Sequence, residues 1–147
     1  MGDLVIREAV VGDLAACAAI VNADIDARGF MPRTVTVEDI EAMFVPTLLE
    51  ARVLLVAESE GAVLGYLSSE PTGDVRGFYV RADAQGKGVG KALMDGAKAR
   101  FPAGLRLTVF EPNTGGQRFY VREGFVDTGV RSVDDGVPVM HLEWVPR

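Results

Sequence analysis

The chain has 147 residues, enough for a single domain spanning residues 1–147 with a hydrophobic core that needs no disulfide or structural metal. Its 48% hydrophobic and 24% charged residues exclude a disordered chain, its net charge of −6 argues against nucleic acid as a partner, and one cysteine with one histidine cannot form a Cys/His zinc site. No apolar run approaches the roughly 18 residues that cross a membrane, and the start lacks the features of a secretory signal, so we expect a cytoplasmic protein with no membrane partner.

The first part of the chain predicts one strand and two helices. Residues Leu4–Ala9 are apolar and β-branched, which is typical of a strand. A helix follows from Asp13, the predicted N-cap, and its apolar face includes Cys17, which we expect in the core. The segment Arg28–Thr36 predicts a loop, and Thr36 caps a second helix that Pro46 breaks or kinks.

The middle of the chain predicts three consecutive strands. Val53–Ser59 and Val63–Ser69 flank a glycine-containing turn, which favours a hairpin. Pro71-Thr72-Gly73 predicts a turn into a third strand, Asp74–Arg81. These three runs predict an antiparallel meander.

The last part of the chain alternates helices and strands. The predicted elements are a helix from the Gln85–Gly90 segment to about Phe101, a strand Leu105–Phe110, a helix Thr114–Glu123, and strands Phe125–Ser132 and Val137–Trp144. The whole order is β-α-α-β-β-β-α-β-α-β-β. It predicts a mixed α/β (α+β) domain with an antiparallel meander in the middle and one βαβ crossover.

The glycine-rich segment at the strand-to-helix junction has the clearest chemical character. Gly86, Gly88 and Gly90 leave backbone N–H groups unobstructed at a helix N-terminus, and Lys87 and Lys91 add positive charge, so the segment predicts a phosphate cradle. Residues 76–125 as a whole carry a balance of +5 against −11 for the rest of the chain, which also favours an anionic ligand here. The alternative is a tight turn that binds nothing.

Two nucleotide-binding motifs fail at specific positions. A P-loop would need glycine at Gln85 and Ser or Thr at Ala92. A Rossmann fingerprint would need glycine at Lys91 or Leu93, and it should follow a first strand rather than a meander.

The segment Gln85-Gly86-Lys87-Gly88-Val89-Gly90 instead resembles the Gln/Arg-x-x-Gly-x-Gly/Ala signature of the GNAT superfamily of N-acetyltransferases. A second block, from Asn113 through Phe119-Tyr120 to Gly124-Phe125, is similar to the family's Asn-x-x-Ala-x-x-Phe-Tyr-x-x-x-Gly-Phe. Two departures are Gly116 where alanine is usual and Ala82 where proline is common. The resemblance implies a GNAT-like fold: a central, mostly antiparallel sheet of about six or seven strands with a parallel splayed pair, and about four helices.

The resemblance also implies acetyl-CoA as cosubstrate, bound between the splayed strands. It places the pantetheine arm on the strand residues Phe78, Tyr79 and Val80. Asn113 would contact the cofactor arm, or act only as a helix cap, and Phe119 belongs to the same block. The pyrophosphate would lie on the loop residues Gln85, Gly86, Lys87, Gly88, Val89, Gly90 and Lys91.

Acetyl transfer by direct attack needs an oxyanion donor, a general acid and a route for the amine proton. A backbone N–H near Val80 is the expected donor, and the resemblance assigns the acid role to Tyr120, whose alternative is an ordinary half-buried aromatic. The base is less defined: Asp74 is the first candidate, Glu58 and Glu70 are alternatives, and a water chain is another. We expect His141 on a strand surface, without a catalytic role.

The sequence therefore predicts an acyltransferase that moves the acetyl group of acetyl-CoA to a primary amine of a small molecule, peptide or protein. The alternative functions are a non-catalytic acyl-CoA-binding sensor and a structural domain without a ligand. The acceptor site would lie among the first two helices, the loop between them and the last hairpin, where Phe30 and Met31 could line a pocket. Preference for a longer acyl group and a homodimer, common among GNAT-like proteins, both stay open.

Overall fold

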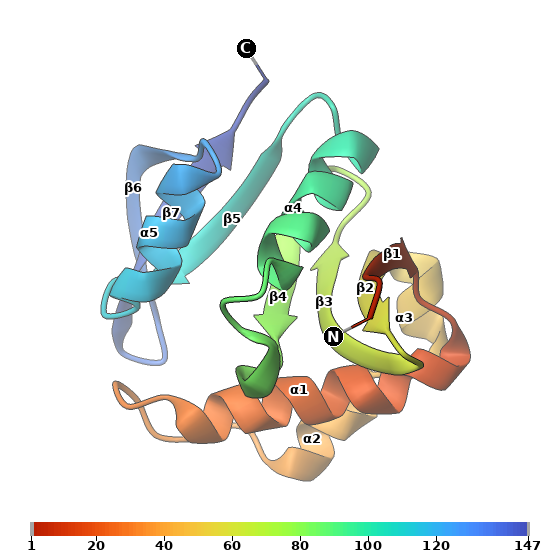
Figure 1. Ribbon diagram of the computed structural model, residues 1–147. Coiled ribbons are helices and arrows are strands. Elements are labelled where there is room, and N and C mark those ends of the chain that lie inside the picture. The colour runs from red at the N-terminus through yellow and green to blue at the C-terminus, as the bar shows by residue number, and fades with distance from the viewer. Residues whose placement is uncertain (1, 147) are drawn as a thin grey trace.

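The computed structural model describes residues 2–146, which contain seven strands and five α-helices (Figure 1). The strands are β1 (Val5–Glu8), β2 (Val53–Ser59), β3 (Ala62–Ser69), β4 (Val75–Val80), β5 (Leu105–Phe110), β6 (Val126–Asp134) and β7 (Val137–Trp144). The helices are α1 (Leu14–Ala27), α2 (Val37–Met43), α3 (Pro46–Ala51), α4 (Val89–Arg100) and α5 (Thr114–Arg122). The predicted mixed class and strand order are confirmed.

The seven strands divide into two antiparallel sheets rather than one continuous sheet. The first has the order β1-β2-β3-β4 and the second the order β5-β7-β6. A single parallel bridge, between Asp74 and Arg106, connects them where β4 and β5 begin. Beyond that bridge the two strands separate, which is the splayed parallel pair that the sequence predicted.

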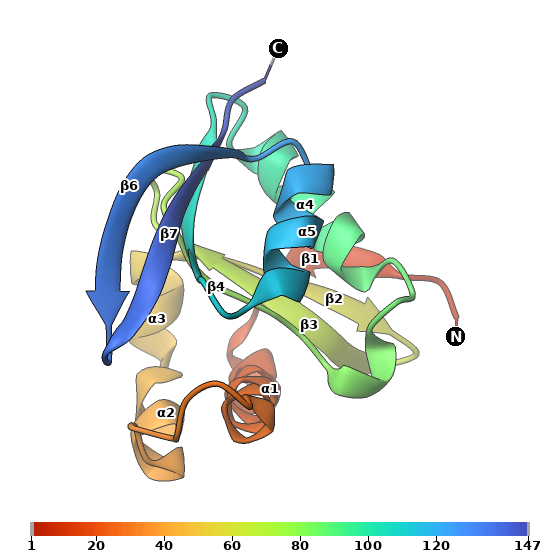
Figure 2. The ribbon, with the colours of Figure 1, turned by 90° about the vertical axis from the view of Figure 1, so that its left-hand side faces the viewer.

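Helices cover both faces of the first sheet. Figure 2 shows α1, α2 and α3 on one side of β2–β4, and α4 with α5 on the other. Each side has its own buried cluster. On one side, Leu93 of α4 packs in a cluster with Leu67 and Leu105. On the other side, Cys17 of α1 packs in a cluster with Val56. Burial raises the pKa of the Cys17 thiol to about 12, so this predicted core residue is chemically protected.

The segment after α2 differs from the prediction. Thr36 caps α2 as expected, with its hydroxyl accepting from the Asp39 N–H at 3.1 Å. α2 then ends at Met43, and Pro46 opens the separate helix α3 instead of only breaking α2. Proline suits the first helical position because its missing N–H has no partner there in any helix. This accounts for five α-helices where about four were predicted.

Two segments far apart in sequence meet at the open end of the splayed strands. The Thr34 hydroxyl donates to the Asp135 carboxylate at 2.9 Å, which connects the α1–α2 loop to the β6–β7 hairpin. No helix within residues 2–146 is both long and apolar enough to span a membrane.

Candidate active site

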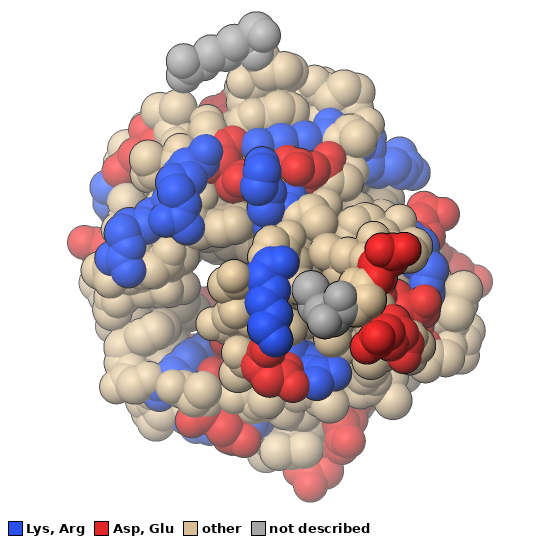
Figure 3. All heavy atoms as spheres, viewed as in Figure 1, with Lys and Arg blue, Asp and Glu red and all other residues tan. Residues whose placement is uncertain are grey.

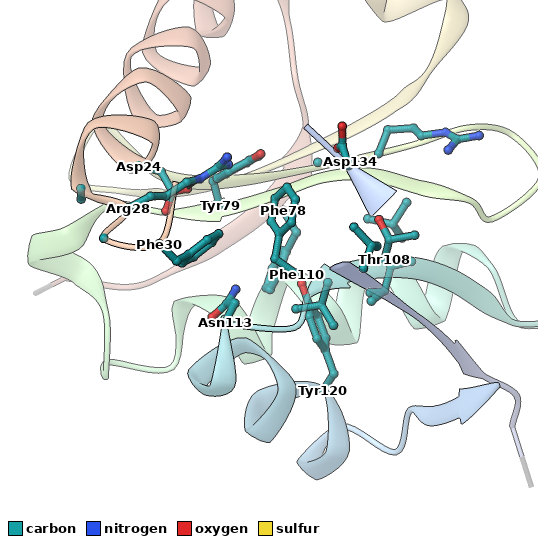
Figure 4. Close-up of a pocket in the computed structure, with 18 residues that line it drawn as sticks. Asp24, Arg28, Phe30, Phe78, Tyr79, Thr108, Phe110, Asn113, Tyr120 and Asp134 are labelled. Atoms are coloured by element: carbon teal, nitrogen blue, oxygen red, sulfur yellow. Dashed lines mark hydrogen bonds and ion pairs between the residues drawn. The ribbon is translucent and has the colours of Figure 1, made fainter. Parts of the chain in front are cut away.

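A cleft of about 460 Å³ lies where β4 and β5 separate. Its walls come from both strands, from the end of α1 with the following loop, and from the start and middle of α5. In Figure 4, Asp24, Arg28 and Phe30 lie on the α1 side, and Asn113 and Tyr120 lie on the α5 side. The molecular surface is also hollowed between α5 and α4 (Figure 3). The cleft can therefore be approached from both faces of the sheet.

β4 presents a free backbone edge to this cleft. The Arg81 N–H donates to the Leu64 carbonyl at 2.8 Å, toward β3. Since successive residues of an antiparallel strand point their amide groups to opposite sides, Tyr79 also faces β3 while Phe78 and Val80 face β5. β5 has moved away at this level, so these groups can pair with amides of an extended ligand or donate to a developing oxyanion.

The loop after β4 leads directly into the N-terminus of α4. Gly86 and Gly88 have φ angles of +76° and +83°, a left-handed conformation that L side chains adopt only with strain. Gly88 is the N-cap of α4, so the first N–H groups of that helix have no intrahelical acceptor. Val89 buries its side chain in the core and can bind only through its backbone. The loop therefore has the backbone geometry of the predicted phosphate cradle.

Positive side chains surround this cradle. Lys87 is exposed, and Lys91 interacts with Asp95 at 3.4 Å and Glu123 at 3.5 Å. Figure 3 shows Lys and Arg gathered over α4 and α5, with acidic side chains toward the N-terminal part of the same face. The Gln85 amide donates to the Val80 carbonyl at 3.3 Å and so fixes the start of the loop. An anion on these N–H groups would be favoured by both the helix dipole and the lysines.

Close packing connects the cradle to the cleft. A Cβ at Gly90 would lie 3.4 Å from the Phe78 ring and 3.5 Å from the Phe119 ring. The two rings contact each other with centroids 5.5 Å apart. The two Cβ distances are ordinary van der Waals distances, so alanine would also fit at this position, and the approach of α4 to β4 places the loop beside the strand edge.

Tyr120 is the acid–base side chain that lines the cleft beside β4. Its ring contacts those of Phe78, Phe119 and Phe125, with centroids 6.1, 5.5 and 5.5 Å away. Burial raises the pKa of the Tyr120 phenol well above its ordinary value of 10. The hydroxyl therefore stays protonated near neutral pH and can donate a hydrogen bond, or its proton, to a thiolate formed beside it.

Asn113 is the N-cap of α5. Its side-chain oxygen accepts from the Gly116 N–H at 2.9 Å at the start of α5. A Cβ at Gly116 would lie only 2.6 Å from the Asn113 side-chain nitrogen, so alanine there would require the end of the Asn113 side chain to move. Asn113 also lines the cleft, so the cap and a ligand contact are compatible.

Asp74 lies at the bridge between the sheets, outside the residues that line the cleft. The Arg106 guanidinium donates to both of its oxygens, at 2.9 and 3.3 Å, and Thr72 donates as well. These bonds, first that of Arg106, lower the pKa of the Asp74 carboxyl from 3.8 to about 2. Such a carboxylate accepts protons poorly at neutral pH. The geometry therefore disfavours the predicted role of general base and favours a clamp between the two sheets.

The substitution Asp74→Asn separates these two roles. If Asp74 acts as a clamp, Asp74→Asn should lower the free energy of unfolding at pH 7. The expected loss is about 1 kcal/mol, because the Asp74–Arg106 pair is partly exposed and solvent screens it. The folded pKa is depressed, so the wild-type advantage should hold above about pH 4 and disappear as pH falls toward 2. Denaturant unfolding of both proteins across this range measures it. A large loss of turnover with unchanged stability would instead identify Asp74 as the base.

The other predicted bases lie elsewhere. Glu58 accepts from Arg7 at 2.7 Å on β2, and Glu70 accepts from Arg76 at 2.6 Å at the end of β3. His141 is half-buried on β7 with its Nε2 2.8 Å from the Ser132 hydroxyl, as expected for a strand residue. None of Glu58, Glu70 and His141 lines the cleft. Within residues 2–146, no group of three or more His, Cys, Asp or Glu could hold a metal ion.

Sequence reasoning named only Phe30 and Met31 on the acceptor side. Phe30 does line the cleft, and its ring lies 5.5 Å from that of Phe110. The structure adds Arg28 and Asp24, which the sequence did not single out. Their i,i+4 spacing on α1 was the available signal, because it predicts an ion pair but not what that pair faces.

Comparison with known proteins agrees with this geometry. Residues 19–146 match the family model described as an acetyltransferase (GNAT) domain. The solution structure of apo YjaB from Escherichia coli is 26% identical, with 99% of both chains covered and a TM-score of 0.78. Two further structures share the fold: yncA from Salmonella typhimurium with its cofactor acetyl-CoA (24%, 98% of this chain and 94% of that chain, TM-score 0.74), and ribosomal-protein-alanine N-acetyltransferase from Brucella melitensis (23%, 97% and 99%, 0.74).

No curated protein matches the chain. The family model nevertheless covers most of the sequence, including β4, the glycine loop and α5. The resemblance seen in the two sequence blocks is confirmed. The chain belongs to the GNAT acetyltransferase family.

Proposed function

We propose that the protein transfers the acetyl group of acetyl-CoA to a primary amine by direct attack within the cleft between β4 and β5. One observation carries the proposal: β4 and Tyr120 line the cleft, and the glycine loop continues from the end of β4 into the N-terminus of α4, where Gly90 approaches Phe78. This arrangement suits an extended, amide-containing polyanion whose reactive end must meet a proton donor.

The residues fit acetyl-CoA in two ways. Phe78 and Val80 offer outward N–H and C=O groups to the amides of the pantetheine arm. Gly86 and Gly88 leave the loop without side chains, so its N–H groups, together with those at the start of α4, can receive the pyrophosphate. The remaining loop residues from Gln85 to Lys91 act through their backbone or their charge. Asn113 lines the cleft on the α5 side, and the Phe119 ring packs against that of Phe78.

The transfer forms a C–N bond and breaks the thioester C–S bond. A neutral amine attacks the carbonyl carbon, and a backbone N–H near Val80 stabilises the oxygen as it becomes negative, a contribution of about 3 kcal/mol. The sulfur leaves with the bonding electrons, and Tyr120 donates its phenolic proton to it. The amine proton passes to water, because Asp74, the first predicted base, lies outside the cleft and is held by Arg106.

The acceptor would enter from the side of α1, opposite to the glycine loop. The walls there are Arg28, Phe30 and Asp24, and the Thr34–Asp135 bond borders that opening. A cleft of about 460 Å³ suits a small molecule or the end of a peptide rather than a folded surface. The alternative, an acyl-CoA-binding module without catalysis, would not need a protonated phenol inside the cleft.

The test is acetylation of a panel of primary amines with purified protein and acetyl-CoA. We expect release of the CoA thiol that depends on both the amine and the protein, together with an N-acetylated product identified by mass. Because Cys17 is fully buried, a thiol reagent should report CoA without interference from the folded protein. Tight binding of acetyl-CoA with no amine turned over would favour the binding module instead.

A further inference from the structure

Arg28 occupies an unusual place for a charged side chain. It is the residue that ends α1, and only 19% of its side chain is exposed. Its guanidinium carbon lies 5.5 Å from the centre of the Phe110 ring, and the residue lines the cleft (Figure 4). A guanidinium in such a position has lost most of its water, so it needs acceptors from the protein or from a ligand.

The protein supplies few of those acceptors. The Arg28 Nε atom reaches the Asp24 carboxylate at 3.3 Å, and Nη1 reaches only the Met31 sulfur, at 3.9 Å. Within residues 2–146, neither terminal nitrogen of Arg28 donates to a carboxylate or a backbone carbonyl; a further side-chain partner is the neutral Tyr79 phenol, which lines the same cleft. By contrast, the terminal nitrogens of Arg33 donate to Asn22 and Asp26 at 2.9 to 3.0 Å.

The unused edge of Arg28 is the one that binds oxyanions best. The two terminal N–H groups of a guanidinium form a planar fork that matches the two oxygens of a carboxylate. Asp24 contacts the Nε position instead, and its own side chain is 41% exposed, which makes it a weak partner. The fork therefore remains available to an anion inside the cleft.

The other charged residues around the cleft also support Arg28 as its anion-binding group. Arg76 also lines it, but its Nε and Nη2 both donate to Glu70, at 2.8 and 2.6 Å. Asp24 and Asp134 add negative charge, which would attract the ammonium form of an incoming amine before it loses its proton. The rest of the wall mixes apolar residues, such as Phe30 and Val139, with polar ones, such as Thr108 and Asn113. The cleft thus combines one anion-binding group, acidic groups and a wall of mixed polarity.

We propose that Arg28 binds the carboxylate of the acceptor, so that the preferred substrate is a free amino acid. This inference rests on the proposed acetyl transfer and specifies its acceptor. Arg28 and Tyr120 lie on opposite sides of the cleft in Figure 4. An amino acid held by Arg28 through its carboxylate would direct its amine across the cleft toward the phenol.

The test compares matched pairs of acceptors that differ only in the carboxylate: phenylalanine with phenethylamine, leucine with isopentylamine, and methionine with 3-(methylthio)propylamine. We expect kcat/KM for the amino acid to exceed that for the matched amine by about 10- to 100-fold, the effect of a charge-assisted hydrogen-bonded pair. The difference should lie mainly in KM, because the carboxylate is bound equally before and during transfer.

Variants of Arg28 test whether this residue causes the preference for the amino acid over the matched amine. In Arg28→Gln the ratio between the members of each pair should fall to near one, while Arg28→Lys, which keeps the charge without the fork, should retain part of it. KM for acetyl-CoA should stay the same in both variants. Arg100→Gln is the matched control, since Arg100 is an exposed arginine at the end of α4, remote from the cleft lining, and it should leave every ratio unchanged. Thermal unfolding of each variant checks that the fold is intact.

Two results would overturn the inference. Equal turnover of amino acids and matched amines, or a preference that survives Arg28→Gln in a folded protein, would remove the role of Arg28 and leave the proposed acetyl transfer standing. No turnover of any member of the panel, with acetyl-CoA bound, would overturn the acetyl transfer and the acceptor assignment together.

Discussion

Replacing Tyr120 with phenylalanine is expected to lower kcat for amine acetylation by about 100-fold, the contribution of a general acid. The phenol lines the cleft, burial keeps it protonated, and no described residue accepts a hydrogen bond from it in the structure. Without that proton the departing thiolate must leave as an anion or wait for water. Steady-state kinetics at saturating acetyl-CoA and amine measure the loss.

The same substitution should leave binding and folding almost unchanged, since only a hydroxyl without a protein partner is removed. KM for acetyl-CoA and the melting temperature are therefore expected to match the wild type. Tyr66→Phe is the matched control, because Tyr66 is another buried phenol with a raised pKa but lies outside the cleft lining. Full activity of the Tyr120→Phe protein would show that water, and not the phenol, protonates the leaving group.

Gly88→Ala is expected to weaken acetyl-CoA binding by about tenfold. Gly88 has φ +83° and ψ 5°, a conformation that costs an L residue about 1–2 kcal/mol. The loop can relieve this strain only by rotating the N–H groups that we propose as the pyrophosphate site. Calorimetric titration of acetyl-CoA into the variant measures the loss of affinity.

Gly12→Ala provides the comparison. Gly12 lies in the short helical turn before α1, has no positive φ, and a Cβ there would meet nothing within 4 Å. Its affinity for acetyl-CoA should equal that of the wild type. If Gly88→Ala folded and bound acetyl-CoA normally, the loop conformation would have no part in cofactor binding.

Local chemistry made most of the fold predictable. Thr36 caps α2 because its hydroxyl satisfies a free N–H, and the glycines after β4 begin α4 because their φ angles suit a left-handed turn. The glycine-containing turns between apolar runs identified the meander of β2, β3 and β4, which pair as expected. Each of these signals acts over a few neighbouring residues.

Long-range pairing was less accessible. The arrangement of two sheets joined at Asp74 and Arg106 could not be predicted, because these residues are 32 positions apart and no periodicity within either strand specifies their contact. Pro46 was interpreted as the end of a helix, although the same ring geometry suits the first residue of a helix. The local pattern allowed both interpretations, and packing decided between them.

The residues of the candidate site also differ in how far the sequence could identify them. Tyr120 and the glycine loop were identified because their two blocks resemble the family; in the structure Tyr120 lines the cleft, and the loop leads from β4 into α4. Asp74 was named from its position at a strand start, but its bond to Arg106 turns it into a weak base. Arg28 had no motif at all, since its importance comes from Phe110 and from a cleft wall assembled from distant segments.

The most direct test of the account is thermal unfolding with and without acetyl-CoA, with ATP and NAD as parallel ligands. At 100 times its dissociation constant, acetyl-CoA should stabilise the fold by about 2.7 kcal/mol, a rise of several degrees for a domain of this size. We expect that rise with acetyl-CoA and no comparable rise with ATP or NAD. An unchanged melting temperature with acetyl-CoA, or a larger rise with ATP, would contradict the assignment of the cleft and its glycine loop to acetyl-CoA.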